Sequence, residues 1–224
     1  QLVSGVGTQV NVQYKSPTIA GITFTGAMAP DVGAADANDK GNTSTTDITG
    51  RAYDGTLNVN PSFGTEILSG LNLFVGGSMT EHYNETAGLN NRYEAVAGAT
   101  LDLGPISVGY AMSGISTGKT TNPADMDAYK NHMYGIAFNI NDDLSISYGF
   151  HDSQGFTVSG SDSSYTAGQE LDNKVITEVE STQIAYTMGG ASIRLADIDV
   201  DNASYQTAAA FDKSARLLSV SLAF

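Results

Sequence analysis

Apolar and polar residues alternate along most of the chain with a period of two, in runs of about eight to twelve residues. The carboxyl-terminal run shows this most clearly. Its apolar positions are Leu218, Val220, Leu222 and Phe224, and the positions between them are Leu217, Ser219, Ser221 and Ala223. Because successive side chains of a β-strand point to opposite faces, the pattern predicts strands with one apolar face and one polar face.

Eleven such runs predict eleven strands and an all-β fold. They cover residues 8–15, 22–29, 50–60, 70–81, 92–103, 106–115, 131–140, 144–152, 179–188, 191–200 and 214–224. The connections alternate between short ones, such as 104–105 and 189–190, and long polar ones, such as 30–49 and 153–178. This spacing is typical of an antiparallel up-and-down sheet with tight turns at one end and long loops at the other.

Two folds are compatible with the alternation. One is a secreted or surface β-sandwich that binds a partner or glycan through its long loops, and the other is a transmembrane β-barrel. We call the two sets of alternating positions in each run the apolar parity and the polar parity. The polar parity holds mainly Ser, Gly, Ala, Thr and Asn, with fewer charges than a solvated sandwich face carries. Aromatic residues recur near strand ends on the apolar parity, as membrane-interface girdles require. They are Tyr14, Tyr53, Tyr93, Tyr134, Phe150 and Phe224. Both features favour the barrel.

Composition removes several functional classes. The 224 residues include 24 acidic and 10 basic side chains, for a formal charge of −14, which opposes binding to nucleic acid. The chain has no cysteine and therefore no disulfide or thiolate metal site. No Ser, His and Asp positions suggest a catalytic triad, so we predict no catalytic residues and no enzyme activity.

Three segments resemble general porins of Gram-negative bacteria, particularly the alphaproteobacterial type. Residues 14–21 (YKSPTIAG) resemble the strand and Ser-Pro turn that follow the constriction loop of these porins. Residues 189–193 (GGASI) resemble their last hairpin, and residues 216–224 (RLLSVSLAF) resemble the outer-membrane signature with a terminal Phe. The resemblance implies a homotrimeric channel in the bacterial outer membrane, in contact with lipid and lipopolysaccharide. It also implies that Leu218, Val220, Leu222 and Phe224 form a signal for the barrel assembly machinery.

The number of predicted strands indicates whether the chain forms a whole barrel. Bacterial single-chain barrels have an even number of strands, and the resembled porins have about sixteen, with a constriction loop folded inward after the fifth. We therefore interpret residues 1–224 as a single barrel domain, incomplete at its amino end, that begins just after this loop.

The polar parity supplies candidate pore-lining residues. Its charged members are Lys15, Asp54, Glu94, Asp102 and Arg194. Charges on the walls of a narrow pore act on passing ions, although each of these could instead only solvate the wall or pair with a neighbour. We expect passive diffusion of ions and small polar solutes. The preference for cations should be weak, lowered by Glu94→Gln and raised by Lys15→Gln.

One segment resembles the start of a calcium-binding loop. It runs from Asp197 through Asp199 and Asp201, but its sixth position is Asn202 rather than Gly and its twelfth is Ala208 rather than Glu. We therefore predict no specific metal site and no cofactor, and allow only loosely bound calcium at loop carboxylates.

Overall fold

The computed structural model describes residues 3–7, 10–30, 49–61, 69–82, 90–118, 126–157 and 174–222. Its eleven strands form one sheet in which each strand pairs with the next in sequence, from β1 to β11. All pairs are antiparallel. The all-β, up-and-down fold is therefore confirmed. Within the described ranges, no helix is long and apolar enough to cross a membrane.

Most strand bounds follow the alternation in the sequence. The strands are β1 (Val12–Lys15), β2 (Ile22–Ala29), β3 (Thr49–Val59), β4 (Leu71–His82), β5 (Arg92–Leu103), β6 (Ile106–Ser116), β7 (Met126–Asn139), β8 (Leu144–Thr157), β9 (Lys174–Met188), β10 (Ala191–Asp201) and β11 (Lys213–Leu222). β2 and β5 have the predicted bounds, β6 and β10 end one residue later than predicted, and β3 and β4 are each shifted by one residue at both ends. Two short 3-10 turns, η2 (Ala203–Tyr205) and η3 (Ala209–Phe211), lie between β10 and β11.

Three strands are longer than predicted. β7 begins five residues earlier than expected, β8 ends five residues later, and β9 begins five residues earlier. In these extensions the positions on the apolar parity mix polar residues, such as Lys130, Gln154 and Glu178, with apolar ones, such as Phe156 and Ile176. Pairing continues there, since Lys130 lies opposite Gln154. Hydrophobic alternation therefore marks only the part of each strand whose outer face is apolar without interruption.

β1 is shorter than predicted because it begins at Val12. In its register Val12 lies opposite Met28, so an extension to Val10 would place that residue opposite Pro30. Proline has no backbone N–H for the ladder. Residues 8 and 9 lie outside the described part of the chain.

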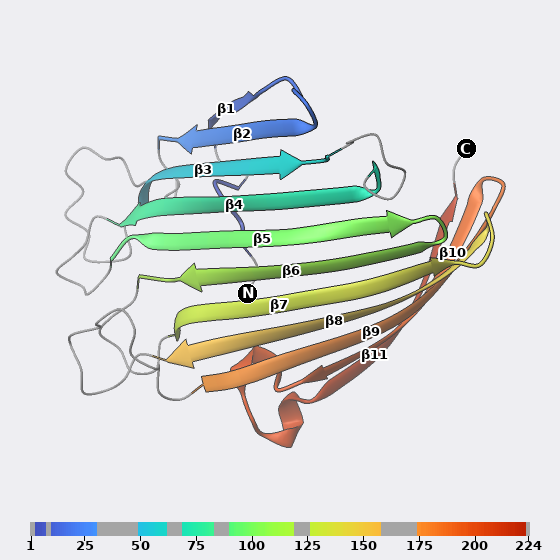
Figure 1. Ribbon diagram of the computed structural model, residues 1–224. Helices are drawn as coiled ribbons and strands as arrows, with labels where there is room; N and C mark the ends of the chain where they lie inside the picture. The colour runs from blue at the N-terminus through green and yellow to red at the C-terminus, as the bar shows by residue number, and fades with distance from the viewer. Residues whose placement is uncertain are drawn as a thin grey trace.

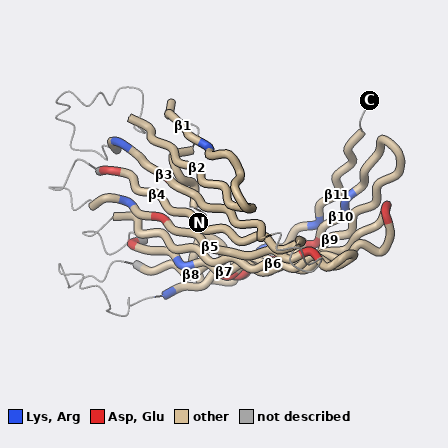
Figure 2. The backbone as a smooth tube through the Cα atoms, turned by 45° about the horizontal axis from the view of Figure 1, so that its top comes forward, with Lys and Arg blue, Asp and Glu red and all other residues tan. Residues whose placement is uncertain are grey.

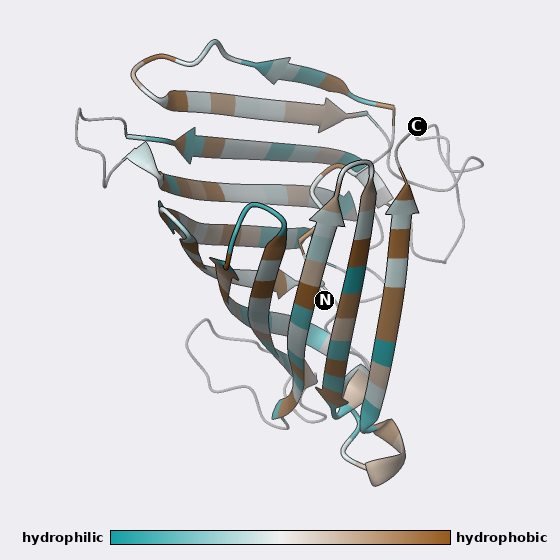
Figure 3. Ribbon diagram, turned by 90° about the vertical axis from the view of Figure 1, so that its right-hand side faces the viewer, coloured by the Kyte–Doolittle hydropathy of each residue, from teal (hydrophilic) through white to brown (hydrophobic). Residues whose placement is uncertain are grey.

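The sheet curves strongly along its width, and the amino-terminal segment lies within the curve (Figures 1 and 3). The short connections lie at one end of the strands and the long ones at the other (Figure 1). Gly104 and Gly189 take positive φ angles of 61° and 57° in the two-residue turns, a conformation that L-residues rarely adopt. We call the end with the long connections the outer end.

The outer face of the sheet, turned away from the amino-terminal segment, carries the large apolar side chains. Val75, Ile136 and Val220 are each about half exposed, at 51%, 48% and 59%. Tyr134 and Phe150 stack there at opposed positions, with ring centroids 4.8 Å apart. Apolar and polar residues alternate along the strands, and charged residues are sparse (Figures 2 and 3). A sandwich would bury its apolar face between two sheets, so the sandwich alternative is wrong for the described chain.

Candidate functional site

All five charged residues predicted to line a pore occupy one face of the sheet. Directly opposed residues of antiparallel strands share a face. One row of opposed residues consists of Asp54, Ser78 and Glu94. A second row consists of Asp102, Ser107, Ala137, Ser147, Gln183 and Ala196. Lys15 joins this face through Thr25, which lies opposite both Lys15 and Thr56. Arg194 joins it because it lies two residues from Ala196 on β10. We call this the inner face.

Residues 3–7 lie against the inner face and are held there by two carboxylates. The backbone N–H groups of Ser4 and Gly5 donate to Glu94 Oε2 at 2.9 and 3.1 Å. The N–H of Val6 donates to Asp54 Oδ2 at 2.9 Å. The Val6 side chain packs with Ala29 and Ala52 in the small apolar cluster of the described residues. This short segment therefore covers the wall formed by β3–β5.

Glycine is needed in this segment for two reasons. Gly5 has a φ of +60°, and a Cβ added to it would lie 2.8 Å from Asp54 Oδ2. Gly7 also has a positive φ, of +69°. A larger residue at Gly5 would push the segment away from the carboxylate that holds it.

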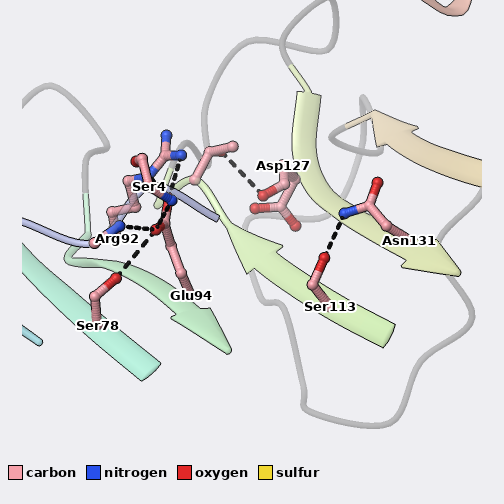
Figure 4. A network of polar contacts seen from close by, with 9 residues as sticks. Ser4, Ser78, Arg92, Glu94, Ser113, Asp127 and Asn131 are labelled. Atoms are coloured by element: carbon pink, nitrogen blue, oxygen red, sulfur yellow. Dashed lines mark hydrogen bonds and ion pairs between the residues drawn. The ribbon is translucent and has the colours of Figure 1, made fainter. Parts of the chain in front are cut away.

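Glu94 is the centre of the polar network shown in Figure 4. Its Oε1 accepts hydrogen bonds from Arg92 Nε at 2.9 Å and Nη2 at 2.5 Å, and its Oε2 accepts one from Ser78 Oγ at 3.1 Å. Only 3% of its side chain is exposed. The position of Glu94 on the inner face agrees with the prediction, but its carboxylate is paired and covered. It cannot act as a free charge on passing ions.

The other predicted residues differ in exposure. Lys15, Asp102 and Arg194 are exposed, and Ser107 Oγ donates to Asp102 Oδ1 at 2.5 Å. Asp54 is half-buried beneath residues 3–7. The structure therefore brings Asp54 and Glu94 together under one segment, and leaves the other three separate on the wall.

Sequence reasoning missed Arg92 and Phe74. Arg92 lies two residues from Glu94 on the same strand face, and opposite charges at i and i+2 are a signal that could have revealed the pair. Phe74 lies on the polar parity, opposite Gly98, whose missing side chain leaves room for the Phe74 ring. A large apolar residue on the wrong parity beside a glycine would have marked this position.

A second polar network crosses β6–β8 on the inner face, toward the outer end. Asn131, which is fully buried, donates from Nδ2 to Ser113 Oγ at 2.9 Å. Its Oδ1 accepts a hydrogen bond from Ser153 Oγ at 2.5 Å. The three side chains form a ladder that fixes neighbouring strands through their inner side chains.

The predicted assembly residues lie on the edge strand β11. Leu218, Val220 and Leu222 are exposed on its outer face, opposite Leu195, Ile193 and Ala191 of β10. Phe224 lies outside the described residues. These three side chains continue the apolar outer face to the edge of the sheet.

The segment that resembles a calcium loop is an ordinary strand. Asp197, Asp199 and Asp201 lie on the outer face of β10, and Arg216 Nε lies 3.3 Å from Asp197 Oδ1. In the described part of the chain, no three His, Cys, Asp or Glu residues come together where they could hold a metal ion. Calcium at the loop carboxylates stays a prediction, because most of these residues lie outside the described ranges.

No protein-family model matches the sequence, and none of the curated proteins searched matches it. Two bacterial channels of known structure are similar in fold. The anion-selective porin from Comamonas acidovorans has a TM-score of 0.60 and 14% identity, over 87% of this chain and 50% of the porin. The outer membrane channel DcaP of Acinetobacter baumannii has a TM-score of 0.58 and 11% identity, over 95% of this chain and 60% of the channel. The chain therefore has the porin-type fold and spans half to three fifths of these proteins.

Proposed function

We propose that this chain forms part of the wall of a water-filled channel in the outer membrane of a Gram-negative bacterium. Ions and small polar solutes would diffuse through it passively, without catalysis. We also propose that the eleven strands belong to a barrel of about sixteen, of the alphaproteobacterial general-porin type. Its partners would be membrane lipid, lipopolysaccharide, the barrel assembly machinery and two further copies of the protein in a homotrimer.

The observation that carries the proposal is the distribution of side chains between the two faces. Large apolar side chains are exposed on the outer face, where a soluble protein would expose polar ones. The inner face carries Ser, Thr, Asn and Gln with a few charged residues, and residues 3–7 lie against it. Lipid outside and water inside is the arrangement that satisfies both faces. Residues 3–7 would narrow the channel beside β3–β5.

Ion preference tests this proposal. The positive charges of Lys15 and Arg194 on the inner wall are offset by the negative charges of Asp54 and Asp102, and Arg92 neutralises Glu94. The wall is thus nearly balanced, and the excess of acids in the whole chain should attract cations to the mouth. We expect channels in planar bilayers with a weak cation preference that fades as salt screens these charges. Lys15→Gln should strengthen the preference and Asp102→Asn should weaken it.

Reversal potentials in a salt gradient measure this preference. The measurement uses the whole barrel that contains these strands, and absence of conductance from that correctly folded protein would refute the channel. An anion preference, or one unaffected by either substitution, would show that charges elsewhere control the pore.

Assembly provides an independent prediction. Val220→Asp places a charge on the apolar outer face of β11, whereas Ser221→Asp places the same charge on its inner face. We expect Val220→Asp, or deletion of Phe224, to lower the yield of inserted protein several-fold, with little effect of Ser221→Asp. The measurement is the amount of heat-modifiable protein in outer-membrane fractions. Equal yields for Val220→Asp and Ser221→Asp would contradict the role of the terminal apolar residues.

A further inference from the structure

The connection between β10 and β11 folds over the inner face instead of extending away from the strands. Thr177 Oγ1 on β9 donates to the carbonyl oxygen of Asn202 at 2.7 Å. Asn202 Nδ2 donates in turn to the carbonyl oxygen of Ile176 at 2.9 Å. The N–H of Asn202 also donates to Asp212 Oδ1 at 3.1 Å, across the same connection. These bonds tie residues 202–205 to the outer end of β9.

Tyr205 connects this turn to β7 and β8 through its side chain. Its hydroxyl lies 2.7 Å from Ser153 Oγ, and its ring lies against Tyr129 with a centroid separation of 5.2 Å. Ser153 lies opposite Asn131 and Tyr129 lies opposite Gly155, all on the inner face. The Tyr205 side chain therefore lies on the side of the sheet that faces the proposed channel.

The wall is shaped to receive the Tyr205 ring. A Cβ added to Gly155 would lie 2.7 Å from Tyr205 Cδ1, so the ring occupies the space that a side chain at this position would fill. Ser153 connects Tyr205 to the buried Asn131 and Ser113 ladder. A tyrosine phenol is neutral at physiological pH at its usual pKa, and burial raises the pKa of Tyr205 further.

The backbone of the turn is held in an unfavourable conformation. Asn202, Ser204 and Tyr205 have φ angles of 54°, 59° and 58°, in the left-handed region that residues other than glycine rarely adopt. Such a conformation persists only where surrounding contacts determine it, and these residues are often functional. The hydrogen bonds of Asn202 and the packing of Tyr205 provide those contacts.

We propose that residues 202–205 form a fixed ledge at the outer mouth of the channel, and that Tyr205 limits the size of solutes that enter. This inference rests on the proposed channel function. The ledge lies beside β7–β9, whereas residues 3–7 lie beside β3–β5. Both elements lie beside one row of paired residues, formed by Glu94, Ile115, Tyr129 and Gly155. The ledge would exclude large neutral sugars while admitting small ones.

Two alanine substitutions on β8 form a matched test. Gly155→Ala forces the Tyr205 ring to move, whereas Gly149→Ala on the same inner face meets no atom within 4 Å. The whole barrel that contains these strands is reconstituted in liposomes, and swelling rates are compared for a monosaccharide and a pentasaccharide. Gly155→Ala and Tyr205→Ala should raise the pentasaccharide rate several-fold relative to the monosaccharide rate, and Gly149→Ala should leave the ratio unchanged.

Tryptic cleavage after Lys213 reports on the ledge independently of transport. Lys213 Nζ donates to the carbonyl oxygen of Ala210 in the same connection, so release of the ledge should speed cleavage. Faster cleavage with an unchanged sugar ratio would overturn Tyr205 as the size limit. An unchanged ratio and unchanged cleavage in both Gly155→Ala and Tyr205→Ala would overturn the ledge itself. If the unsubstituted protein admits no sugar at all, the proposed channel fails instead.

Discussion

Arginine in place of Val108 is expected to destabilise the protein in a lipid bilayer by about 2–4 kcal/mol, the range for a cation on the lipid face of a barrel. Val108 lies on the outer face of β6, opposite Leu101 and Ile136, so a guanidinium there has only apolar neighbours across both strands. Water cannot reach it without distorting the bilayer. Urea-induced unfolding in vesicles, followed by tyrosine fluorescence, measures the change in the free energy of unfolding.

The adjacent residue provides the control. Ser107→Arg places the same side chain on the inner face, where it meets Asp102 and the proposed water-filled channel. We expect little loss of stability there and a change in conductance. Ile146→Arg and Ser147→Arg repeat the comparison on β8. Greater destabilisation by the two serine substitutions would mean that the faces are reversed, and with them the proposed lining.

Removal of the Glu94 carboxylate is the second change with a large expected effect. Glu94→Ala leaves Arg92 and the N–H groups of Ser4 and Gly5 without their acceptor. Loss of one partner from a buried, charged network costs about 2–3 kcal/mol, and Arg92, with 24% of its side chain exposed, regains some hydration. We expect destabilisation near the lower value, with higher conductance because residues 3–7 are released from the wall.

Asp102→Ala is the matched control for Glu94→Ala. Asp102 is an exposed carboxylate on the same strand and face, with one hydrogen bond from Ser107. Its loss should cost below about 1 kcal/mol and leave conductance close to that of the unsubstituted protein. If Glu94→Ala changed ion preference but not conductance or stability, Glu94 would act as a free pore charge and not as an anchor.

The regular part of the sheet could be predicted because the two faces of each strand carry different types of residue, which alternate in the sequence. β5 and β6 alternate over most of their length between apolar and small or polar residues, so their two faces and nearly all of their bounds followed from the period of two. The signal ended where polar residues interrupt the apolar outer face. β9 continues through Glu180 and Glu178 to Lys174, and its pairing there depends on backbone hydrogen bonds that the side-chain pattern does not reveal.

The site was less predictable because its contacts join distant parts of the chain. Parity placed Glu94 on the correct face, yet the segment that covers it is about ninety residues away, with separations of 90 and 89 in the two backbone hydrogen bonds. Tyr205 and Ser153 are separated by 52 residues. Periodicity describes which face a residue takes, but not which loop returns to lie over it.

The unbroken register of the strands limits how this protein can vary in length. Within the described strands the pairing shifts only between Thr49 and Ala52 and between Met126 and Ala128, both near outer ends. A deletion of one residue from the middle of β7 would reverse the faces of all strand residues on one side of the gap. If the carboxyl-terminal side were reversed, Ile136 would face the water and Ala137 the lipid. Insertions in the long outer connections disturb no such pairing. Outside the β10–β11 connection, whose contacts hold the ledge in place, the outer connections can therefore vary in length by insertion and deletion, while the strands beneath them tolerate only substitution.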